Sequence, residues 1–424
     1  MLSLQIIREQ RDRVIESLGK RRFKNAGSLI DEVIELDQKR RDVQLRNDGI
    51  LSESNTLAKE IGLLMKTGKK EEAEKVKSKT SELKKQSTEL SAELAALESE
   101  LQQLLYSIPN TPDEKVPAGS GSEDNITIHE HGALPQLPES AQPHWDLIKK
   151  YDIIDFDLGN KISGAGFPVY KGKGAKLQRA LINFFLDQAT AQGYKEIQPP
   201  LVVNEASGYG TGQLPDKEGQ MYHVTADNLF LIPTAEVPIT NLYRDMILSD
   251  SEIPTRNVGY TPCFRREAGS WGAHVRGLNR LHQFDKVEIV QIRKPDESAR
   301  ALDEMCAYVQ SLLELLELPY RKLLLCGGDM GVNASITYDM EVWAGAQKRW
   351  LEVSSVSNFG SYQANRMKLR FKDEQGKTQL LHTLNGSALA LPRIVAALLE
   401  NNQTNEGIRI PKVLVPYTKF DIIG

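Results

Sequence analysis

The sequence predicts an α+β fold in which an antiparallel pair of long helices precedes a compact domain of strands and helices. Two observations support this prediction: heptad-spaced apolar residues fill 29–108, and a strand–loop–strand pattern occupies 261–291. Proline and glycine cluster between these two regions, where no continuous helix can form. We expect a helical domain at 1–110, a connector at 111–140 and a compact domain at 141–424, since single cores rarely grow past ~250–300 residues.

Two apolar stripes predict the helices of an N-terminal coiled-coil arm. Apolar residues recur in steps of four and three from Leu29 to Leu64 and again from Ala73 to Ile108, which is the spacing of helices that share a seam. The connection at 67–70 is so short that the helices must run antiparallel. At ~40 residues per helix, the arm is about 60 Å long. Polar residues weaken the first stripe but can fix its register, namely Arg40, Asn47 and Ser54.

Basic residues gather at the tip of this arm. Eight lysines face four glutamates there, namely Lys66, Lys69, Lys70, Lys75, Lys77, Lys79, Lys84 and Lys85 against Glu71, Glu72, Glu74 and Glu82. A charge run of this kind is usually only a solvated face. More basic residues stand lower on the arm, so the rod can also hold an RNA backbone through its phosphates: Arg21, Arg22, Lys24, Lys39, Arg40 and Arg41.

The overall composition permits many functions and selects none. The net charge is -4 at pH 7, so the molecule as a whole does not indicate a nucleic-acid ligand. The three cysteines, Cys263, Cys306 and Cys326, lack the spacing of a disulfide framework or a metal site, which suits a reducing compartment. No signal peptide is visible, and no apolar run reaches the ~18 residues that cross a membrane. We expect a cytoplasmic protein with no membrane partner.

The strand–loop–strand at 261–291 carries charged residues at positions where burial in a sheet would be costly in free energy. Alternation along an ideal strand puts Arg265 and Glu267 on one face and Arg266 on the other. On the returning strand, Phe284, Lys286 and Glu288 share a face, and a carboxylate between β-branched neighbours is costly unless it meets a cation. The pattern is typical of a nucleotide site. The alternative is an exposed hairpin with ordinary surface charges.

A second charged segment lies near the C-terminus, at 378–403. We expect a short strand, a polar turn at Asn385-Gly386-Ser387 and then an apolar helix. Pro392 fits the first turn of that helix, where a missing amide hydrogen costs little. Arg393 follows it, and the alternative for such an arginine is a helix-surface residue that extends its head to water.

These two segments resemble a known family. FRREAG and NGSALALPR are similar to the second and third signature motifs of class II aminoacyl-tRNA synthetases, and specifically of bacterial-type seryl-tRNA synthetases. Residues 231–241 resemble the serine-binding loop of that family, 338–371 its ATP and metal segment, and 155–187 the start of its catalytic domain. The resemblance covers nearly the whole chain and implies a mainly antiparallel sheet with flanking helices. Pro199-Pro200 resembles the end of the first class II motif, which implies a homodimer.

The resemblance also implies two substrate sites. For L-serine the matching residues are Thr234, Ala235, Glu236, Arg265, Glu288 and Ser387. For ATP they are Arg265, Arg266, Glu267, Leu281, Phe284, Glu352, Val353, Ser354, Ser355 and Arg393. Arg265 would contact the α-phosphate and Arg393 the γ-phosphate, so these two are the expected catalytic residues. Glu352 and Ser355 would hold Mg²⁺, but they have opposite parity on an ideal strand, so the backbone must bulge or turn between them.

The implied activity is that of a serine–tRNA ligase. Serine and ATP would give seryl-adenylate and pyrophosphate, and the seryl group would pass to the 3′ end of tRNA(Ser); the resemblance also allows tRNA(Sec). Because serine's carboxylate is already an anion, alignment and charge neutralisation suffice without a protein nucleophile. One alternative is a paralogue that binds serine or tRNA without charging it. Another is a class II synthetase for proline or threonine, although those carry a C-terminal anticodon domain.

Overall fold

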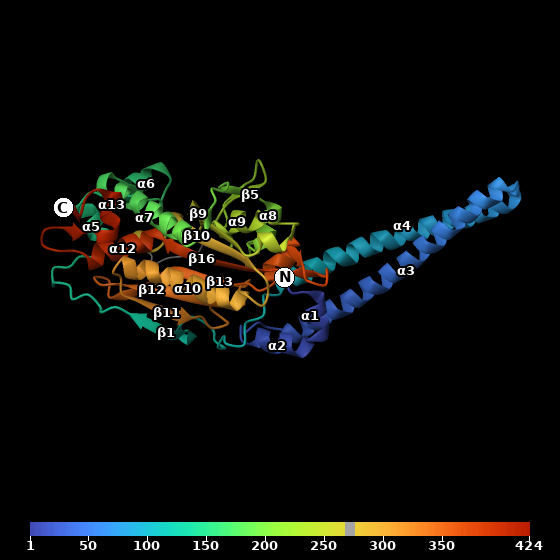
Figure 1. The fold of residues 1–424 in the computed structure, drawn as a ribbon, viewed down its shortest axis with the longest axis horizontal. Helices are drawn as coiled ribbons and strands as arrows, with labels where there is room; N and C mark the ends of the chain where they lie inside the picture. The colour runs from blue at the N-terminus through green and yellow to red at the C-terminus, as the bar shows by residue number, and fades with distance from the viewer. Residues whose placement is uncertain (268–275) are drawn as a thin grey trace. The chain divides into compact units, whose positions relative to one another are not determined.

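The computed structural model describes residues 1–267 and 276–424. The chain divides into two compact units, both drawn in Figure 1. A helical unit holds Leu2–Gly19 and Phe23–Pro109, and a larger unit holds Met1, Lys20–Arg22 and Asn110–Gly424. Within the described residues, no helix has the length and apolar character needed to span a membrane.

The helical unit is dominated by an antiparallel hairpin of two long helices, α3 and α4 (Figure 1). Its helices are α1 (Leu4–Glu9), α2 (Arg11–Gly19), α3 (Ala26–Lys66) and α4 (Lys70–Ser107). The buried residues of the hairpin come from the two predicted stripes, among them Val33, Leu36 and Val43 on α3 and Leu83 and Leu90 on α4. The predicted helical arm is therefore confirmed.

Two polar residues are buried in the helical unit, and both have partners. Asn47 donates from Nδ2 to Ser91 Oγ at 3.2 Å, and its Oδ1 accepts from Ser87 Oγ at 2.8 Å. The amide that interrupts the apolar stripe of α3 is therefore hydrogen-bonded to α4. Asp37 is fully buried and pairs with Arg8, Arg40 and Arg41 at 2.6, 2.9 and 3.3 Å. Burial alone would raise the pKa of Asp37, but hydrogen bonds from Arg40 and Arg8 hold it below its usual value.

The larger unit is built on an eight-stranded sheet in the order β1-β11-β12-β13-β16-β10-β9-β4. Every neighbouring pair is antiparallel except β4 and β9. The strands are β1 (Ile126–His131), β4 (Lys195–Glu196), β9 (Thr255–Phe264), β10 (Gln283–Arg293), β11 (Tyr320–Leu324), β12 (Ile336–Ala344), β13 (Arg349–Asn358) and β16 (His382–Ala390). The predicted antiparallel sheet is confirmed. Strand β1 lies within 111–140, so part of the expected connector belongs to this sheet.

Helices cover one face of this sheet and form the main core with it. Helices α7 (Gly172–Ala191), α10 (Ser298–Leu315) and α12 (Leu391–Asn401) pack against the central strands (Figure 1). Val287 and Ile289 of β10 lie in this core, as side chains that alternate with Glu288 should. The opposite face of the central strands is polar. Cross-strand pairs place the following residues on it: Glu288 with Ser387, Asn385 with Ser357, Thr337 with Ser357, and Asp339 with Ser355.

Shorter elements complete the larger unit. The helices are α5 (His144–Lys150), α6 (Phe156–Ile162), α8 (Glu205–Thr211), α9 (Glu236–Asn241), α11 (Tyr362–Met367) and α13 (Val415–Thr418), with 3-10 turns η1 (Ser122–Asp124), η2 (Asp250–Glu252), η4 (Gly277–Asn279) and η5 (Lys412–Leu414). The strands are β2 (Ile154–Asp155), β3 (Val169–Tyr170), β5 (Val202–Asn204), β6 (His223–Val224), β7 (Leu229–Leu231), β8 (Ile247–Leu248), β14 (Arg370–Lys372), β15 (Thr378–Leu380), β17 (Ile408–Arg409) and β18 (Ile422–Ile423).

Two local predictions were wrong. Strand β9 ends at Phe264, and Glu267 has a left-handed φ of 50°, so strand parity does not decide where Arg265, Arg266 and Glu267 point. The glycine-rich loop expected after them falls at 268–275, outside the described residues.

The polar turn expected at Asn385-Gly386-Ser387 is also absent, because these residues lie inside strand β16. Gly386 pairs with Ile289 of β10 on one side and with Val356 of β13 on the other. A Cβ on Gly386 would lie 3.0 Å from Val356 Cγ2. The glycine therefore permits close packing between strands rather than a reversal of the chain.

Candidate active site

A buried ion pair occupies the polar face of the central strands. Lys286 Nζ lies 2.6 Å from Glu288 Oε2, and the two side chains are 7% and 2% exposed. Lys286 also donates to Thr234 Oγ1 at 2.8 Å, and Ser387 Oγ donates to Glu288 Oε2 at 3.3 Å. A buried pair of this kind persists only where further hydrogen bonds satisfy its remaining lone pairs and protons. The structure thus brings together Thr234, Glu288 and Ser387, as predicted for one site.

The hydroxyl of Thr234 is committed as an acceptor. It accepts from Lys286 Nζ and also from the backbone N–H of Glu236 at 3.3 Å. A hydroxyl has two lone pairs and one hydrogen, so Thr234 can act on a ligand only as a donor. Glu288, as a carboxylate, can act only as an acceptor. The site therefore offers a ligand a hydrogen-bond donor, the Thr234 hydroxyl, and an acceptor, the Glu288 carboxylate.

Glu236 is a second buried carboxyl of this site, at the start of α9. Gln363 Nε2 donates to its Oε1 at 2.6 Å, and Thr383 Oγ1 donates to Gln363 Oε1 at 2.7 Å. Burial raises the pKa of Glu236 to about 7, against the bond from Gln363 and with added repulsion from Glu288. Ala235, its neighbour, is fully buried against Val290 and supports α9 on the sheet. Lys286 pairs with Glu288 and also lowers the pKa of Glu236 through its charge, so one lysine serves two carboxyl groups on this face.

Arg265 lies beside the predicted adenine-stacking residue. Its guanidinium carbon is 5.2 Å from the centroid of the Phe284 ring, and its Nε donates to Pro233 O at 3.3 Å, next to Thr234. Leu281 is buried in the main core, which fixes the backbone before Phe284. Glu267 contacts Arg280 through an ion pair, and the Arg266 backbone N–H donates to Gln220 O at 2.8 Å.

Arg393 reaches from the first turn of α12 toward β13. Its Nε donates to Asn279 O at 3.1 Å and its Nη1 to Glu352 O at 2.7 Å, while Nη1 also lies 3.6 Å from the Glu352 carboxylate. Pro392 stands in the first turn of the same helix, as predicted. The arginine is therefore bound to backbone oxygens of η4 and β13 and is not a free surface residue.

A bulge in β13 resolves the parity problem between Glu352 and Ser355. Ser355 pairs with Asp339 and Glu352 with Glu341, and the register shifts between these pairs, so Val353 is the extra residue. Asp339 and Glu341 share a face of β12, which puts Ser355 and Glu352 on one face as well. Ser354 points elsewhere, because its buried Oγ donates to Ser387 O at 2.6 Å.

Comparison with known proteins places this site in a family. A model of the seryl-tRNA synthetase N-terminal domain matches residues 1–112, and one of the tRNA synthetase class II core domain (G, H, P, S and T) matches 222–402. A serine–tRNA ligase from Salinibacter ruber is 50% identical over 428 residues, covering 100% of this chain and 99% of that relative. The chain belongs to the seryl-tRNA synthetase family.

Solved structures of the family agree with this assignment. A seryl-tRNA synthetase from Pyrococcus horikoshii complexed with ATP matches with a TM-score of 0.91 at 33% identity, covering 100% of this chain and 99% of that one. A cytoplasmic serine–tRNA ligase from Naegleria fowleri in complex with AMP matches with a TM-score of 0.86 at 26% identity, covering 100% and 98%. The predicted family, fold class and enzyme class are thereby confirmed, whereas the roles of individual site residues stay predictions.

Sequence reasoning missed Asp339, which lies on β12 opposite Ser355. Burial and repulsion from Glu352 raise the pKa of Asp339, against a hydrogen bond from Ser355. Its Oδ1 is buried and has no hydrogen-bond partner among the described residues. The signal was present, since Asp339 stands between Tyr338 and Met340 just as Glu288 stands between Val287 and Ile289. Lys286 and Gln363 were missed too, because only the fold brings them to Thr234 and Glu236.

Asp339, Glu352 and Ser355 fit a magnesium ion in chemistry. All three offer oxygen, the ligand atom that Mg²⁺ prefers. The buried Oδ1 of Asp339 has no hydrogen-bond partner among the described residues, so it is available to coordinate a cation. Within residues 1–267 and 276–424, no group of three or more His, Cys, Asp and Glu side chains is placed to hold a metal. A magnesium ion here would therefore also depend on the Ser355 hydroxyl, on water and on substrate phosphates.

Proposed function

We propose that this member of the seryl-tRNA synthetase family is a serine–tRNA ligase that activates L-serine with ATP and charges tRNA(Ser). The carboxylate of serine attacks the α-phosphorus, the bond to pyrophosphate breaks, and seryl-adenylate and pyrophosphate form. A ribose hydroxyl at the 3′ end of the tRNA then takes the seryl group and releases AMP. The observation that supports this proposal best is the buried Thr234–Lys286–Glu288–Ser387 cluster beside Arg265.

The cluster suits a small zwitterion that carries a hydroxyl. Glu288 and Glu236 share one lysine, so the ammonium of serine would offset a local excess of negative charge. The hydroxyl of serine would meet Glu288 and the hydroxyls of Thr234 and Ser387, and Arg265 would hold the carboxylate. Ala235 would line the same loop. Because serine provides its own nucleophile, these residues need only align and neutralise the reactants.

The nucleotide would lie along Arg265, Phe284 and Arg393. Phe284 would stack on adenine near the Leu281 backbone, Arg265 would contact the α-phosphate and Arg393 the γ-phosphate. The planar fork of arginine suits phosphate oxygens better than a lysine does. The ATP set also includes Arg266, Glu267, Val353 and Ser354.

Glu352 and Ser355 would hold Mg²⁺, with Asp339 as an added oxygen donor. When bound, Mg²⁺ would neutralise charge on the phosphates. The chain's own contribution there is the bulge at Val353, which turns Glu352 and Ser355 to one face.

The proposed pocket predicts the amino-acid selectivity. Alanine would leave buried polar groups without a partner and should be rejected strongly. Threonine keeps the hydroxyl, so its extra methyl must be excluded by shape, which is worth only about 1–3 kcal/mol. Misactivation should therefore favour threonine over alanine.

The tRNA would bind through the helical arm. The proposed domains are a tRNA-binding region at 1–110, a connector at 111–140 and a catalytic domain at 141–424. The lysines at the arm tip would contact phosphates of tRNA(Ser), and of tRNA(Sec) where that tRNA is also charged. We further propose a homodimer through the 199–200 region and action in the cytoplasm.

Pyrophosphate exchange tests this function directly. Purified protein with ATP and Mg²⁺ is given each amino acid in turn, and label from pyrophosphate is followed into ATP. We expect exchange with serine, followed by charging of total tRNA. Binding of serine or tRNA without any exchange would favour the alternative, a paralogue that holds these ligands without charging them.

A further inference from the structure

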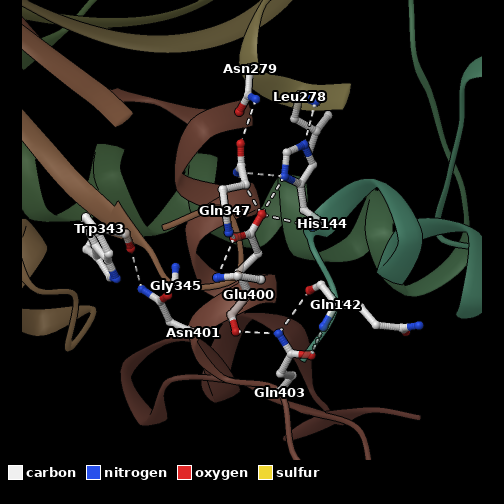
Figure 2. Close-up of polar contacts among 11 residues, drawn as sticks. Gln142, His144, Leu278, Asn279, Trp343, Gly345, Gln347, Glu400, Asn401 and Gln403 are labelled. Atoms are coloured by element: carbon white, nitrogen blue, oxygen red, sulfur yellow. Dashed lines mark hydrogen bonds and ion pairs between the residues drawn. The ribbon is translucent and has the colours of Figure 1, made fainter. Parts of the chain in front are cut away.

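A buried histidine–glutamate pair lies outside the residues assigned above, yet next to them. His144 opens α5 and Glu400 lies near the end of α12, and both side chains are 0% exposed. His144 Nδ1 is 2.8 Å from Glu400 Oε1, as Figure 2 shows. A carboxylate this deeply buried is costly unless it accepts several hydrogen bonds.

Glu400 accepts bonds from two other segments of the chain. Its Oε1 accepts from the His144 backbone N–H at 3.0 Å and from Gln347 Nε2 at 2.7 Å, and its Oε2 from the backbone N–H groups of Ala346 and Gln347 at 3.1 and 3.0 Å. Burial would raise the pKa of Glu400, but the bonds from His144 outweigh it and lower that pKa. An ionised Glu400 therefore joins α5, α12 and the β12–β13 hairpin.

The tautomer of His144 follows from the donor that its Nε2 meets. Its Nε2 accepts from the backbone N–H of Leu278 at 2.9 Å, so the ring hydrogen must sit on Nδ1 and point at Glu400. Gly277 lies directly against the ring, since a Cβ there would be 2.4 Å from Nε2. Next to it, the Arg276 guanidinium carbon is 4.8 Å from the centroid of a Trp145 ring. Helix α5 thus holds the chain that leads into β10.

The same network ends at Arg393. Gln347 donates to Glu400 and accepts from Asn279 Nδ2 at 2.9 Å through its Oε1 (Figure 2). Asn279 in turn accepts from Arg393 Nε at 3.1 Å through its backbone oxygen. Asn279 is 5% exposed, so this chain of bonds is shielded from water. The orientation of the Arg393 guanidinium thus depends on where Asn279 is held.

We propose that His144 and Glu400 are positioning residues that hold Arg393 in place for ATP, through Gln347 and Asn279. This inference rests on the proposed function, in which Arg393 contacts the γ-phosphate. Neither His144 nor Glu400 touches substrate. Their contribution is to hold η4 and the β12–β13 hairpin against α12, so that Arg393 Nε and Nη1 stay bound to Asn279 and Glu352 while its remaining N–H groups would face the nucleotide.

A double-mutant cycle tests the proposal in the full-length protein. Glu400→Gln keeps the shape but sets an amide NH₂ against N–H donors, so Asn279 and Arg393 should shift. We expect kcat/KM for ATP in serine-dependent exchange to fall about 10- to 100-fold, as small misplacements of an aligned group do. The KM for serine should change by less than about twofold, because the serine contacts are untouched. In an Arg393→Ala background, Glu400→Gln should add almost nothing.

A second variant keeps the test usable if Glu400→Gln does not fold. Gln347→Leu leaves the His144–Glu400 pair and the backbone donors to Glu400 intact, and it removes the bonds of the Gln347 side chain to Glu400 and to Asn279. It should lower kcat/KM for ATP in the same direction and lose its effect in the Arg393→Ala background. Asp37→Asn is the matched control, since it removes a buried charge from the helical unit. It should lower thermal stability without changing the KM for ATP.

Two results would overturn the inference, and they can be told apart. If Glu400→Gln or Gln347→Leu lowers kcat/KM by the same factor with and without Arg393, the network does not act through Arg393 and the inference is wrong. If Arg393→Ala by itself leaves kcat/KM for ATP unchanged, then the proposed role of Arg393 is wrong, and the inference falls with it.

Discussion

Asp37 in the helical unit and Glu288 in the sheet unit are both buried carboxylates that meet basic side chains, but the balance of charge around them differs. Asp37 lies within 3.3 Å of three arginines, so positive charge is in excess. Glu288 has a single lysine, which also bonds Thr234, and a second carboxyl, Glu236, lies nearby. The first cluster is complete within the chain, whereas the second lacks a positive charge that a ligand can supply.

This contrast separates a structural ion cluster from a proposed binding site on physical grounds. Burial is the same in both places, so burial alone does not identify a site. What differs is whether the chain's own donors and charges satisfy the buried group. The raised pKa of Glu236 and the orphaned oxygen of Asp339 are two signs of the same deficit. Four measurements test whether the two clusters differ in this way.

Glu288→Ala should have the largest effect. It removes the proposed acceptor for serine and leaves Lys286 buried without its carboxylate. Serine-dependent exchange should fall by about 10³-fold or more, as expected when a group that contacts the reactants is lost. Asp37→Asn should retain exchange. Near-normal exchange by a folded Glu288→Ala protein would show that Glu288, like Asp37, is not needed for exchange.

Asp37→Asn should act on stability instead. Three arginines would face a neutral amide, and breaking a buried ion cluster costs about 3–5 kcal/mol. Urea unfolding of the wild type and the variant measures this loss. Arg13→Gln changes an exposed charge on α2 and provides the mild comparison. A loss for Asp37→Asn no larger than for Arg13→Gln would show that the cluster adds no stability.

Glu236 should make stability depend on pH in a defined direction. Its pKa rises on folding from 4.5 to about 7, so the folded state binds the proton more tightly. Stability from this group is present below pH 4.5 and is lost as the pH rises through 7, by about 3 kcal/mol in all. Glu236→Gln cannot titrate, so its unfolding free energy should drop less than that of the wild type between pH 5 and pH 8. Parallel pH curves for the two proteins would refute the assignment.

The arm tip should give the smallest effect. Replacing Lys69, Lys70 and Lys75 with alanine removes up to three phosphate contacts, so affinity for tRNA should fall about tenfold and the salt slope should flatten by up to ~2. Exchange without tRNA should not change. The measurement is a salt titration of tRNA binding, and a slope equal to that of the wild type would place the RNA elsewhere.

How much the sequence predicted depends on how local each signal is. The hairpin of α3 and α4 was predictable because its heptads and its short turn are local. Glu288 was predictable because a carboxylate between β-branched residues is anomalous wherever it stands. Asn385 to Ser387 were misplaced in a turn because the sequence does not reveal that Gly386 packs against Val356 of a neighbouring strand. Lys286 and Gln363 could not be assigned to the site from the sequence, because only strand register and the packing of α9 and α11 bring them to Thr234 and Glu236.

We propose that a deficit of positive charge around Glu288 and Glu236 selects a small hydroxylated amino acid, and serine-dependent pyrophosphate exchange measures this selection. With Mg²⁺, ATP and the full-length protein, serine should drive rapid exchange, threonine a weaker one and alanine almost none. Equal exchange with serine and alanine, or none with serine in a folded protein, would contradict the account.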